Sequence, residues 1–156
     1  MIFLLEKQGY RSTVFYLIMR NMTLQVRILT PDKLFQDASA DEIILPTNSG
    51  QMGVLTDHAP LMTGLDVGVM LMRQQREWKS FALIGGFAYI KQNQVTILVN
   101  EAEDATSIDA TEAEQAYEKA LRTYEDASGK KQKVDANIVL KRARARFQAV
   151  KASATV

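Results

Sequence analysis

Apolar and polar residues follow two different patterns along this chain of 156 residues. Up to about Ala105, apolar residues alternate with polar ones or stand in short runs, and Gly, Pro, Asn and Asp occupy the gaps. Leu24, Val26 and Ile28 show the alternation clearly. Short strands at such spacing are typical of an antiparallel sandwich or a barrel-like roll. We therefore expect a β-sandwich domain over residues 22–106.

Glycine, proline and asparagine indicate where the expected strands end. Pro46 is expected to stop a strand, and Gly85 with Gly86 is expected to form a bulge or a sharp corner. Gln92 and Asn93 suit a tight hairpin, because Asn tolerates a positive φ. The strand-like runs after the first are residues 40–46, 66–72, 78–84, 86–91 and 94–99.

The period changes after Asp109, where Gly occurs once and Pro is absent. Asp109 with Glu112 three residues later resembles a capping box and predicts the start of a helix. We expect Gly129 to end that helix. Its apolar face recurs at spacings of three and four, through Ala113, Ala116, Tyr117, Ala120, Leu121, Tyr124 and Ala127.

A second helix is expected to begin at Asp135 as its N-cap, with one stripe formed by Val139, Ala143, Phe147 and Val150. The short connection makes the two helices antiparallel neighbours, so residues 107–156 are predicted to form a two-helix hairpin. Apolar burial stabilises by about 25 cal/mol per Å², and Ala offers little area. We therefore expect the hairpin to dock weakly on the sandwich and to move as a unit.

The formal net charge is only +1, but charge is divided within the hairpin. Residues 101–126 hold nine acidic and two basic side chains, whereas residues 130–156 hold eight basic and one acidic. Two interpretations stay open: a solvated helix pair with cross-helix attraction, or a basic face over residues 140–147 that meets an acidic partner. The small net charge gives no argument for nucleic acid or an anionic membrane as partner.

Residues 1–21 hold two short apolar clusters that charged residues separate, at 2–5 and 14–19. This is a poor signal peptide, and no stretch reaches the roughly 20 apolar residues of a transmembrane helix. We expect Met22 to be the true start of the protein and residues 1–21 to be an upstream extension of the reading frame.

Residues 47–61, TNSGQMGVLTDHAPL, contain the only histidine and look like a site. A phosphate-binding P-loop needs a Lys after its second Gly, and none follows here. The catalytic alternative is His58 as a base, oriented by Asp57, with Ser49 or Thr56 as nucleophile. Adjacent side chains on an extended segment point to opposite faces, so Asp57 does not easily orient His58. We favour a structural histidine that bonds a backbone group beside Pro60. With one His and no Cys, we expect no metal site.

Two blocks resemble the epsilon subunit of F-type ATP synthases: LPTNSGQMGVLTDHAPLMTGLDVG at 45–68 and IGGFAYIKQNQVTILVNEAE at 84–103. A weaker match joins IDATEAEQAYEKA at 108–120 to LKRARARFQA at 140–149. The resemblance runs from Met22 to about Ala152 and is strongest to the chloroplast and cyanobacterial branch. It implies a ten-stranded β-sandwich with a C-terminal two-helix hairpin, in a non-catalytic subunit that carries no cofactor.

The resemblance also implies partners and a location. It implies a place on the central stalk, beside the gamma subunit and on the membrane ring of c subunits, with membrane contact only through the complex. The expected membrane is the chloroplast thylakoid on its stromal face, with a cyanobacterial thylakoid as the alternative. Stalk contact with gamma is implied for His58 and Pro60. Docking on the ring is implied for Ser49, Gly50, Gln51, Met52 and Gly53.

A regulatory mechanism is implied as well. In the family, the hairpin lies folded on the sandwich or extends along gamma, where its basic helix approaches the catalytic beta subunits and inhibits ATP hydrolysis. A switch of this kind needs a gap of only a few kcal/mol, which agrees with weak docking. The inhibitory residues on that basic helix would be Lys141, Arg142, Arg144 and Arg146.

Certain bacterial relatives bind ATP through a motif with Arg at the position of Glu112. A carboxylate at that position repels phosphate.

Two rival interpretations stay open. One is a free-standing module that recognises another complex through its basic hairpin. An enzyme that uses His58 is the third possibility, and it rests on that residue alone.

Overall fold

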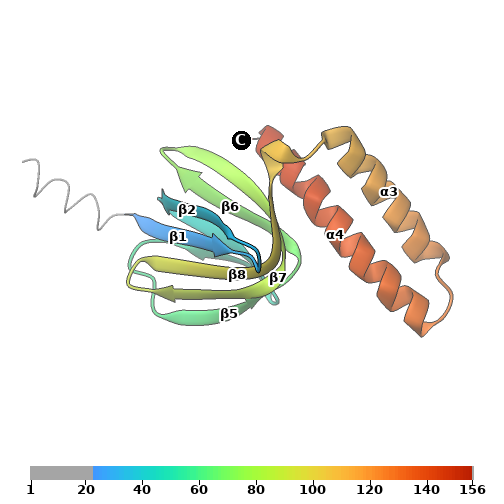
Figure 1. The fold of residues 1–156 in the computed structure, drawn as a ribbon, viewed down its shortest axis with the longest axis horizontal. Helices are drawn as coiled ribbons and strands as arrows, with labels where there is room; N and C mark the ends of the chain where they lie inside the picture. Colours follow the sequence, from blue (N-terminus) through green and yellow to red (C-terminus); the bar gives the residue numbers. More distant parts are fainter. Residues whose placement is uncertain (1–22, 156) are drawn as a thin grey trace, which may run out of the picture.

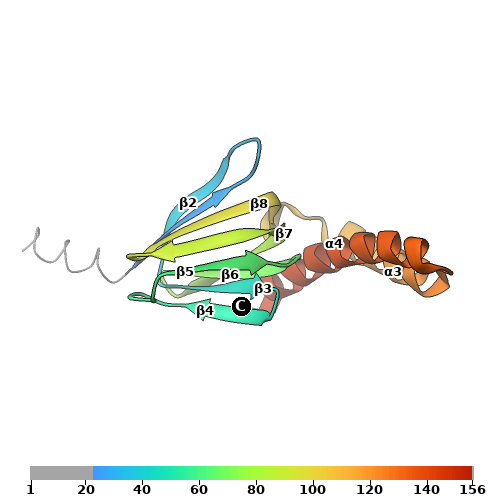
Figure 2. The same cartoon turned by 90° about the horizontal axis from the view of Figure 1, so that it is seen from below.

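The structure is a computed structural model that describes residues 23–155. The expected extension of residues 1–21 and the expected start at Met22 lie outside the described residues. Figure 1 shows a layered group of strands with a pair of helices at one end, and Figure 2 shows the helices projecting away from the strands. The elements are β1 (Leu24–Leu29), β2 (Leu34–Ala40), β3 (Glu42–Thr47), β4 (Gly50–Val54), β5 (Leu61–Leu65), β6 (Gly68–Gln74), β7 (Glu77–Lys91), β8 (Gln94–Asp104), the 3-10 turn η1 (Ala105–Ser107), α3 (Ala110–Asp126) and α4 (Lys130–Thr155).

One long strand, β7, belongs to both layers of the sandwich. Its residues 77–83 pair with β6, and its residues 86–90 pair with β5. The full hydrogen-bonded order is β2-β1-β8-β7-β5-β3-β4, and β6 pairs with both β3 and β7. A sandwich followed by a helical hairpin confirms the predicted fold class. The described residues contain eight strands rather than the implied ten, and one pair, β1 with β8, is parallel.

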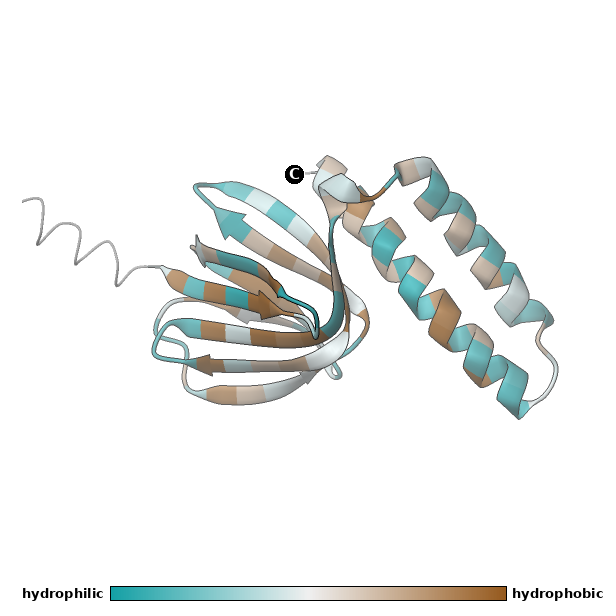
Figure 3. Ribbon diagram, in the orientation of Figure 1, coloured by the Kyte–Doolittle hydropathy of each residue, from teal (hydrophilic) through white to brown (hydrophobic). Residues whose placement is uncertain are grey.

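The sandwich has a core of its own. Leu24, Val26 and Ile28 are fully buried, as their alternation predicts. Every residue of the main core cluster, including its partly buried neighbours, lies between Leu24 and Ala102. Figure 3 shows hydrophobic residues concentrated along the strands. Full burial of one large apolar side chain stabilises by about 1.5–3 kcal/mol, so most of the apolar stabilisation of the sandwich comes from residues outside the hairpin.

Gly85 and Gly86 form a corner in β7, and the alternative of a bulge is wrong. The pairing of β7 with β8 keeps one register from Phe81↔Asp104 to Lys91↔Gln94. Both glycines have positive φ, 54° and 150°. Figure 1 shows that β7 and β8 are both strongly curved. The corner is what carries β7 from one layer into the other.

The prediction that Pro46 stops a strand is wrong. Pro46 lies inside β3, opposite Gln51 of the neighbouring edge strand β4. Its carbonyl oxygen accepts a hydrogen bond of 2.9 Å from the N–H of Asp66. Proline is tolerated in a strand where the missing N–H is not needed by a neighbour, and that condition is met near a sheet edge.

The helix starts were predicted with mixed success. The Asp109 side chain accepts a hydrogen bond of 2.8 Å from the N–H of Glu112, which confirms the predicted cap of α3. Gly129 does not end α3, because Ala127 is its C-cap. Instead Gly129, with φ of 97°, precedes α4, and its carbonyl oxygen accepts a hydrogen bond from Lys133. The predicted N-cap at Asp135 is therefore wrong. The flexible Gly129 allows α4 to begin at Lys130, so Asp135 lies inside the helix.

Gly86→Ala should destabilise the sandwich. A Cβ at this position would lie 1.9 Å from the carbonyl oxygen of Leu98, and the φ of 150° is unfavourable for any other residue. We expect the free energy of unfolding in urea to fall by at least about 2 kcal/mol.

Gly53→Ala is the matched control, because nothing lies within 4 Å of its added Cβ. This variant should be neutral or more stable by up to about 1 kcal/mol. Equal stability of the two variants would contradict the close approach of β8 to Gly86.

Candidate interaction surfaces

The five residues expected at the ring form a turn and an edge strand rather than a loop. The Oγ1 of Thr47 donates a hydrogen bond of 2.6 Å to the Gly50 carbonyl oxygen and closes the β3–β4 turn. Because β4 is the last strand in the order, its outer edge faces no other described strand. Met52 is partly buried against the sandwich core and anchors the strand. The exposed members are Ser49, Gly50, Gln51 and Gly53.

His58 has a structural role in its loop. Its Nδ1 donates a hydrogen bond of 2.7 Å to the Ala59 carbonyl oxygen, which is the backbone contact beside Pro60 that the sequence predicts. The N–H of Asp57 donates a hydrogen bond of 2.6 Å to Oδ1 of Asn93, so the loop is tied to the β7–β8 turn. Among residues 23–155, no three His, Cys, Asp or Glu residues are grouped so that they would hold a metal ion.

The two expected contact regions lie at opposite ends of the sandwich. Thr47, beside the β3–β4 turn, pairs with Leu65 at the end of β5. Leu61, which follows the His58 loop, pairs with Ile90 near the β7–β8 turn. A five-residue strand such as β4 spans about 15 Å, so Ser49 and His58 are not neighbours. This separation also removes the proposed pairing of His58 with Ser49 as a nucleophile.

An exposed apolar patch on the outer face of the sandwich was missed at the level of sequence. Met62 and Phe87 are 68% and 61% exposed, and their cross-strand partners are Tyr89 and Leu98, which are also exposed. Contiguous apolar patches on soluble proteins usually mark interaction sites. The available signal was that both phases of the alternation around residue 88 are apolar, so one phase had to face outward.

A groove of about 560 Å³ continues from this apolar patch toward the β3–β4 turn. Phe87 and Leu98 belong to both features, and Asn48 and Asn100 add amide groups to the groove. Apolar walls with a few convergent amides are suited to a protein segment that carries an apolar side chain. Patch and groove therefore form one continuous surface across β5, β7 and β8.

Three of the four expected inhibitory residues are already paired within the chain. Lys141 lies 3.1 Å from the carboxylate of Asp66, which follows β5. Arg142 pairs with Glu101 of β8, and Arg146 lies 3.1 Å from Glu103 of the same strand and 3.7 Å from Glu112 of α3. Arg144 is exposed and has no ion pair among residues 23–155.

The α4 helix carries two apolar stripes, one toward the sandwich and one toward α3. Ala145 and Ala149 are buried against the sandwich, where Ser80 Oγ donates a buried hydrogen bond of 2.8 Å to the Ala149 carbonyl oxygen. On the α3 side the buried residues are Leu140 and Ala143, and the ring of Phe147 stacks on that of Tyr117 at 5.2 Å. The predicted single stripe is wrong at Val139, which is 58% exposed.

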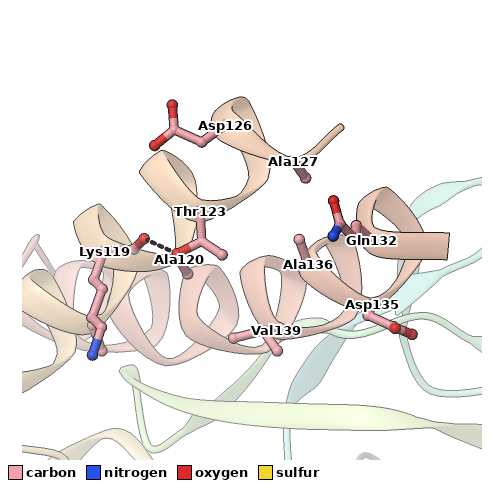
Figure 4. Close-up of a pocket in the computed structure, with 10 residues that line it drawn as sticks. Lys119, Ala120, Thr123, Asp126, Ala127, Gln132, Asp135, Ala136 and Val139 are labelled. Atoms are coloured by element: carbon pink, nitrogen blue, oxygen red, sulfur yellow. Dashed lines mark hydrogen bonds between the residues drawn. The ribbon is translucent and has the colours of Figure 1, made fainter. Parts of the chain in front are cut away.

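An open groove of about 790 Å³ runs between the far halves of α3 and α4. Figure 4 shows Ala120, Ala136 and Val139 along it, with Lys119, Asp126 and Asp135 directed outward. The polar groups do not converge on a common point, so the groove has no evident ligand chemistry. It follows from the small size of the alanine side chains that separate the two helices.

A β-sandwich that carries an exposed apolar patch and a charge-divided helical hairpin defines a class of protein whose surfaces suit contact with other proteins. Two family profiles agree with this assignment. One, described as the ATP synthase Delta/Epsilon chain beta-sandwich domain, matches residues 23–105, and the other, described as the long alpha-helix domain of the same chain, matches residues 106–151. The chain belongs to the ATP synthase delta/epsilon chain family, and within it to the epsilon chains of the chloroplast type.

Curated relatives carry that type in their names. The chain is 62% identical over 130 residues to "ATP synthase epsilon chain, chloroplastic" of Chlorella vulgaris, covering 83% of this chain and 97% of the relative. It is 58% identical over 129 residues to the protein of the same name from Oltmannsiellopsis viridis, covering 83% and 98%. A chain in the Euglena gracilis mitochondrial ATP synthase (OSCP/F1/c-ring) has the same fold, with a TM-score of 0.71 at 21% identity over 85% of this chain and 82% of that one.

The relationship answers two questions that the sequence left open. The protein is a non-catalytic subunit, so the enzyme interpretation of His58 is wrong. The complex is a chloroplast ATP synthase, which links ATP synthesis to proton transport. No helix among residues 23–155 is long and apolar enough to cross a membrane.

The pKa of Asp66 is lowered from its ordinary value of 3.8. The main cause is the hydrogen bond of 2.8 Å from the N–H of Val67, and Lys141 adds a hydrogen bond and its positive charge, while burial acts in the opposite direction. A lowered folded-state pKa stabilises the folded protein fully above the unfolded value, and this stabilisation is lost as the pH falls through the folded value. Asp66 is therefore ionised at neutral pH, where its carboxylate pairs with Lys141.

Lys141→Met should raise the pKa of Asp66 in an NMR titration but leave it below 3.8, because the Val67 hydrogen bond remains. Lys133→Met is the matched control, since Lys133 is exposed and has no contact with Asp66, and it should leave the titration unchanged. An unchanged Asp66 titration in Lys141→Met would show that the pair is not formed in solution.

Proposed function

We propose that this subunit sits on the central stalk, where it couples the gamma subunit to the c-subunit ring and inhibits ATP hydrolysis through its C-terminal hairpin. The observation that carries the proposal is the docking of α4, a strongly basic helix that lies on the sandwich through alanines and partly exposed ion pairs. A helix held in this way can leave the sandwich without exposing a large apolar core.

For the ring contact, we assign the β3–β4 turn and the edge of β4, which comprise Ser49, Gly50, Gln51, Met52 and Gly53. The two glycines have free space around them, so a partner's backbone can approach closely. Gln51 supplies hydrogen bonds without charge. The ring would lie in the thylakoid membrane, and the subunit would be peripheral on the stromal face and would reach the membrane only through the ring.

For the gamma contact, we assign the outer face of the sandwich together with the His58 loop. The apolar patch around Phe87 and Met62 supplies large exposed side chains, and burial of such side chains usually supplies most of the binding energy. His58 and Pro60 lie at the end of β5 that bears Met62, so the loop extends the same surface.

The inhibitory contact is assigned to the basic residues of α4. Freed from the sandwich, Lys141, Arg142 and Arg146 would join the exposed Arg144 on a helix with one acidic residue in its whole length, Asp135. Such a helix fits acidic segments of the catalytic beta subunits. The family membership now favours this assignment over a free-standing module that binds another complex.

A chain that ends at Thr106 should bind the synthase but should not inhibit it. The cut falls after the last strand and outside the main sandwich core, so we expect the truncated chain to keep its fold. We expect the whole chain to lower ATP hydrolysis several-fold when it is added to a catalytic head stripped of its epsilon subunit, and the truncated chain to leave hydrolysis unchanged. Equal inhibition by both chains would place regulation in the sandwich, and binding by neither would favour the free-standing module.

Phe87→Ser should weaken binding to an isolated gamma subunit by at least about tenfold, or 1.4 kcal/mol, because it removes a large apolar side chain from the centre of the patch. Leu34→Ser is the matched control, since Leu34 is similarly exposed but begins β2, outside the patch. Titration calorimetry measures both variants. Equal affinities for gamma would rule out the patch as its docking face.

A further inference from the structure

We propose that three carboxylates of the sandwich, Asp66, Glu101 and Glu103, hold the hairpin in its docked position by occupying the basic residues through which it inhibits. We call these three residues the acidic latch. The inference rests on the proposed function, because the latch regulates hydrolysis only if the freed α4 helix inhibits it. In this view the latch competes with the acidic surface of the partner for the same side chains.

Two latch residues match the spacing of their partners. Glu101 and Glu103 are two residues apart on β8, so they project from one face about 7 Å from each other. Arg142 and Arg146 are four residues apart on α4, about 6 Å along the helix axis. Because the spacings agree, Arg142 meets Glu101 while Arg146 meets Glu103.

Asp66, the third latch residue, contacts α4 on a different side of the helix. Lys141 is turned about 100° around the helix from Arg142, and it donates hydrogen bonds of 3.1 Å to both carboxylate oxygens of Asp66. Asp66 follows β5, whereas Glu101 and Glu103 belong to β8. The helix therefore lies between two groups of carboxylates, which fix its rotation as well as its position along the axis.

Apolar contact between these carboxylates is small. Ala145 and Ala149 pack in a small cluster with Ala82, Ala105 and Ile108, and Val67, Val69 and Val150 are only partly buried against it. Ser80 donates a buried hydrogen bond to the helix backbone at Ala149. Alanine buries far less apolar area than the large aliphatic residues of the sandwich core, so the ion pairs make up a large share of what holds α4. Lys141 and Asp66 remain 42% and 43% exposed, so the pair forms and breaks in contact with water.

If the latch holds α4, neutralising the acidic partners of the ion pairs and neutralising the basic partners should change inhibition in opposite directions. Neutralising Glu101 and Glu103 weakens docking but leaves the basic helix intact, so inhibition should increase. Neutralising Arg142 and Arg146 also weakens docking, but it removes the groups that the target would bind, so inhibition should decrease. A role of the ion pairs in folding alone would move both sets of variants in the same direction.

The docked fraction can be measured on the full chain by energy transfer. Because the chain has no Cys, Lys91→Cys and Ser128→Cys place one dye on the sandwich and one at the tip of the hairpin. On this background, Glu101→Gln with Glu103→Gln should shift the docking equilibrium toward the undocked state by about 2- to 20-fold. Raising the salt concentration should cause a shift in the same direction in the parent chain and a smaller one in the double variant.

Asp32→Asn with Glu77→Gln is the matched control, because it changes net charge equally at exposed residues without an ion pair to α4 in the described part of the chain. It should leave the docked fraction unchanged. A docked fraction that is the same in the latch variant, the control and the parent would overturn the latch.

Hydrolysis by the stripped catalytic head supplies the second measurement. The latch variant should reach half-inhibition at a concentration lower by about the same factor as its docking shift, and Arg142→Gln with Arg146→Gln should require a higher concentration than the parent. A shift in docking without any change in inhibition would support the latch and count against the proposed inhibitory function. Increased inhibition without a docking shift would overturn the latch.

Discussion

Contact between alanines, where α4 crosses the sandwich, governs how the two parts of this molecule are joined. Ala145 and Ala149 let the helix backbone come close to β6, β7 and η1, but they bury little apolar surface. A leucine at either position would add area and strengthen docking, at the cost of separating the surfaces. Because these small residues bury little area, the ion pairs to Asp66, Glu101 and Glu103 contribute a large share of the attraction between α4 and the sandwich.

The corner at Gly85 and Gly86 is the second feature that determines where the surfaces of the molecule lie. It allows β7 to run through both layers, so that its first half, with Ser80 and Ala82, lies under α4, while its second half, with Phe87 and Tyr89, carries the apolar patch. The surface that holds the hairpin and the surface proposed for gamma thus share one strand. They are nevertheless separate surfaces, so the hairpin does not cover the patch.

The basic side chains of α4 pair mainly with the sandwich and not, as the simplest expectation has it, with the acidic helix α3. Attraction between an acidic helix and a basic one was the bland interpretation, yet only Arg146 reaches an acidic residue of α3, and at 3.7 Å. The closer pairs of α4 are all with the sandwich. Candidate residues on α4 could be found from sequence because basic residues cluster there, whereas their partners could not, since Asp66 is 75 residues away from Lys141 in the chain.

Sequence alone determined the features that depend on nearby residues. The alternation of Leu24, Val26 and Ile28 predicted their burial, Asp109 predicted a cap, and Gln92 with Asn93 predicted a tight turn, where both have positive φ. Tertiary structure decided the parallel pairing of β1 with β8, the outward apolar patch and the partners of α4. Periodicity and caps act over a few residues, whereas the choice among distant partners depends on how the whole chain packs.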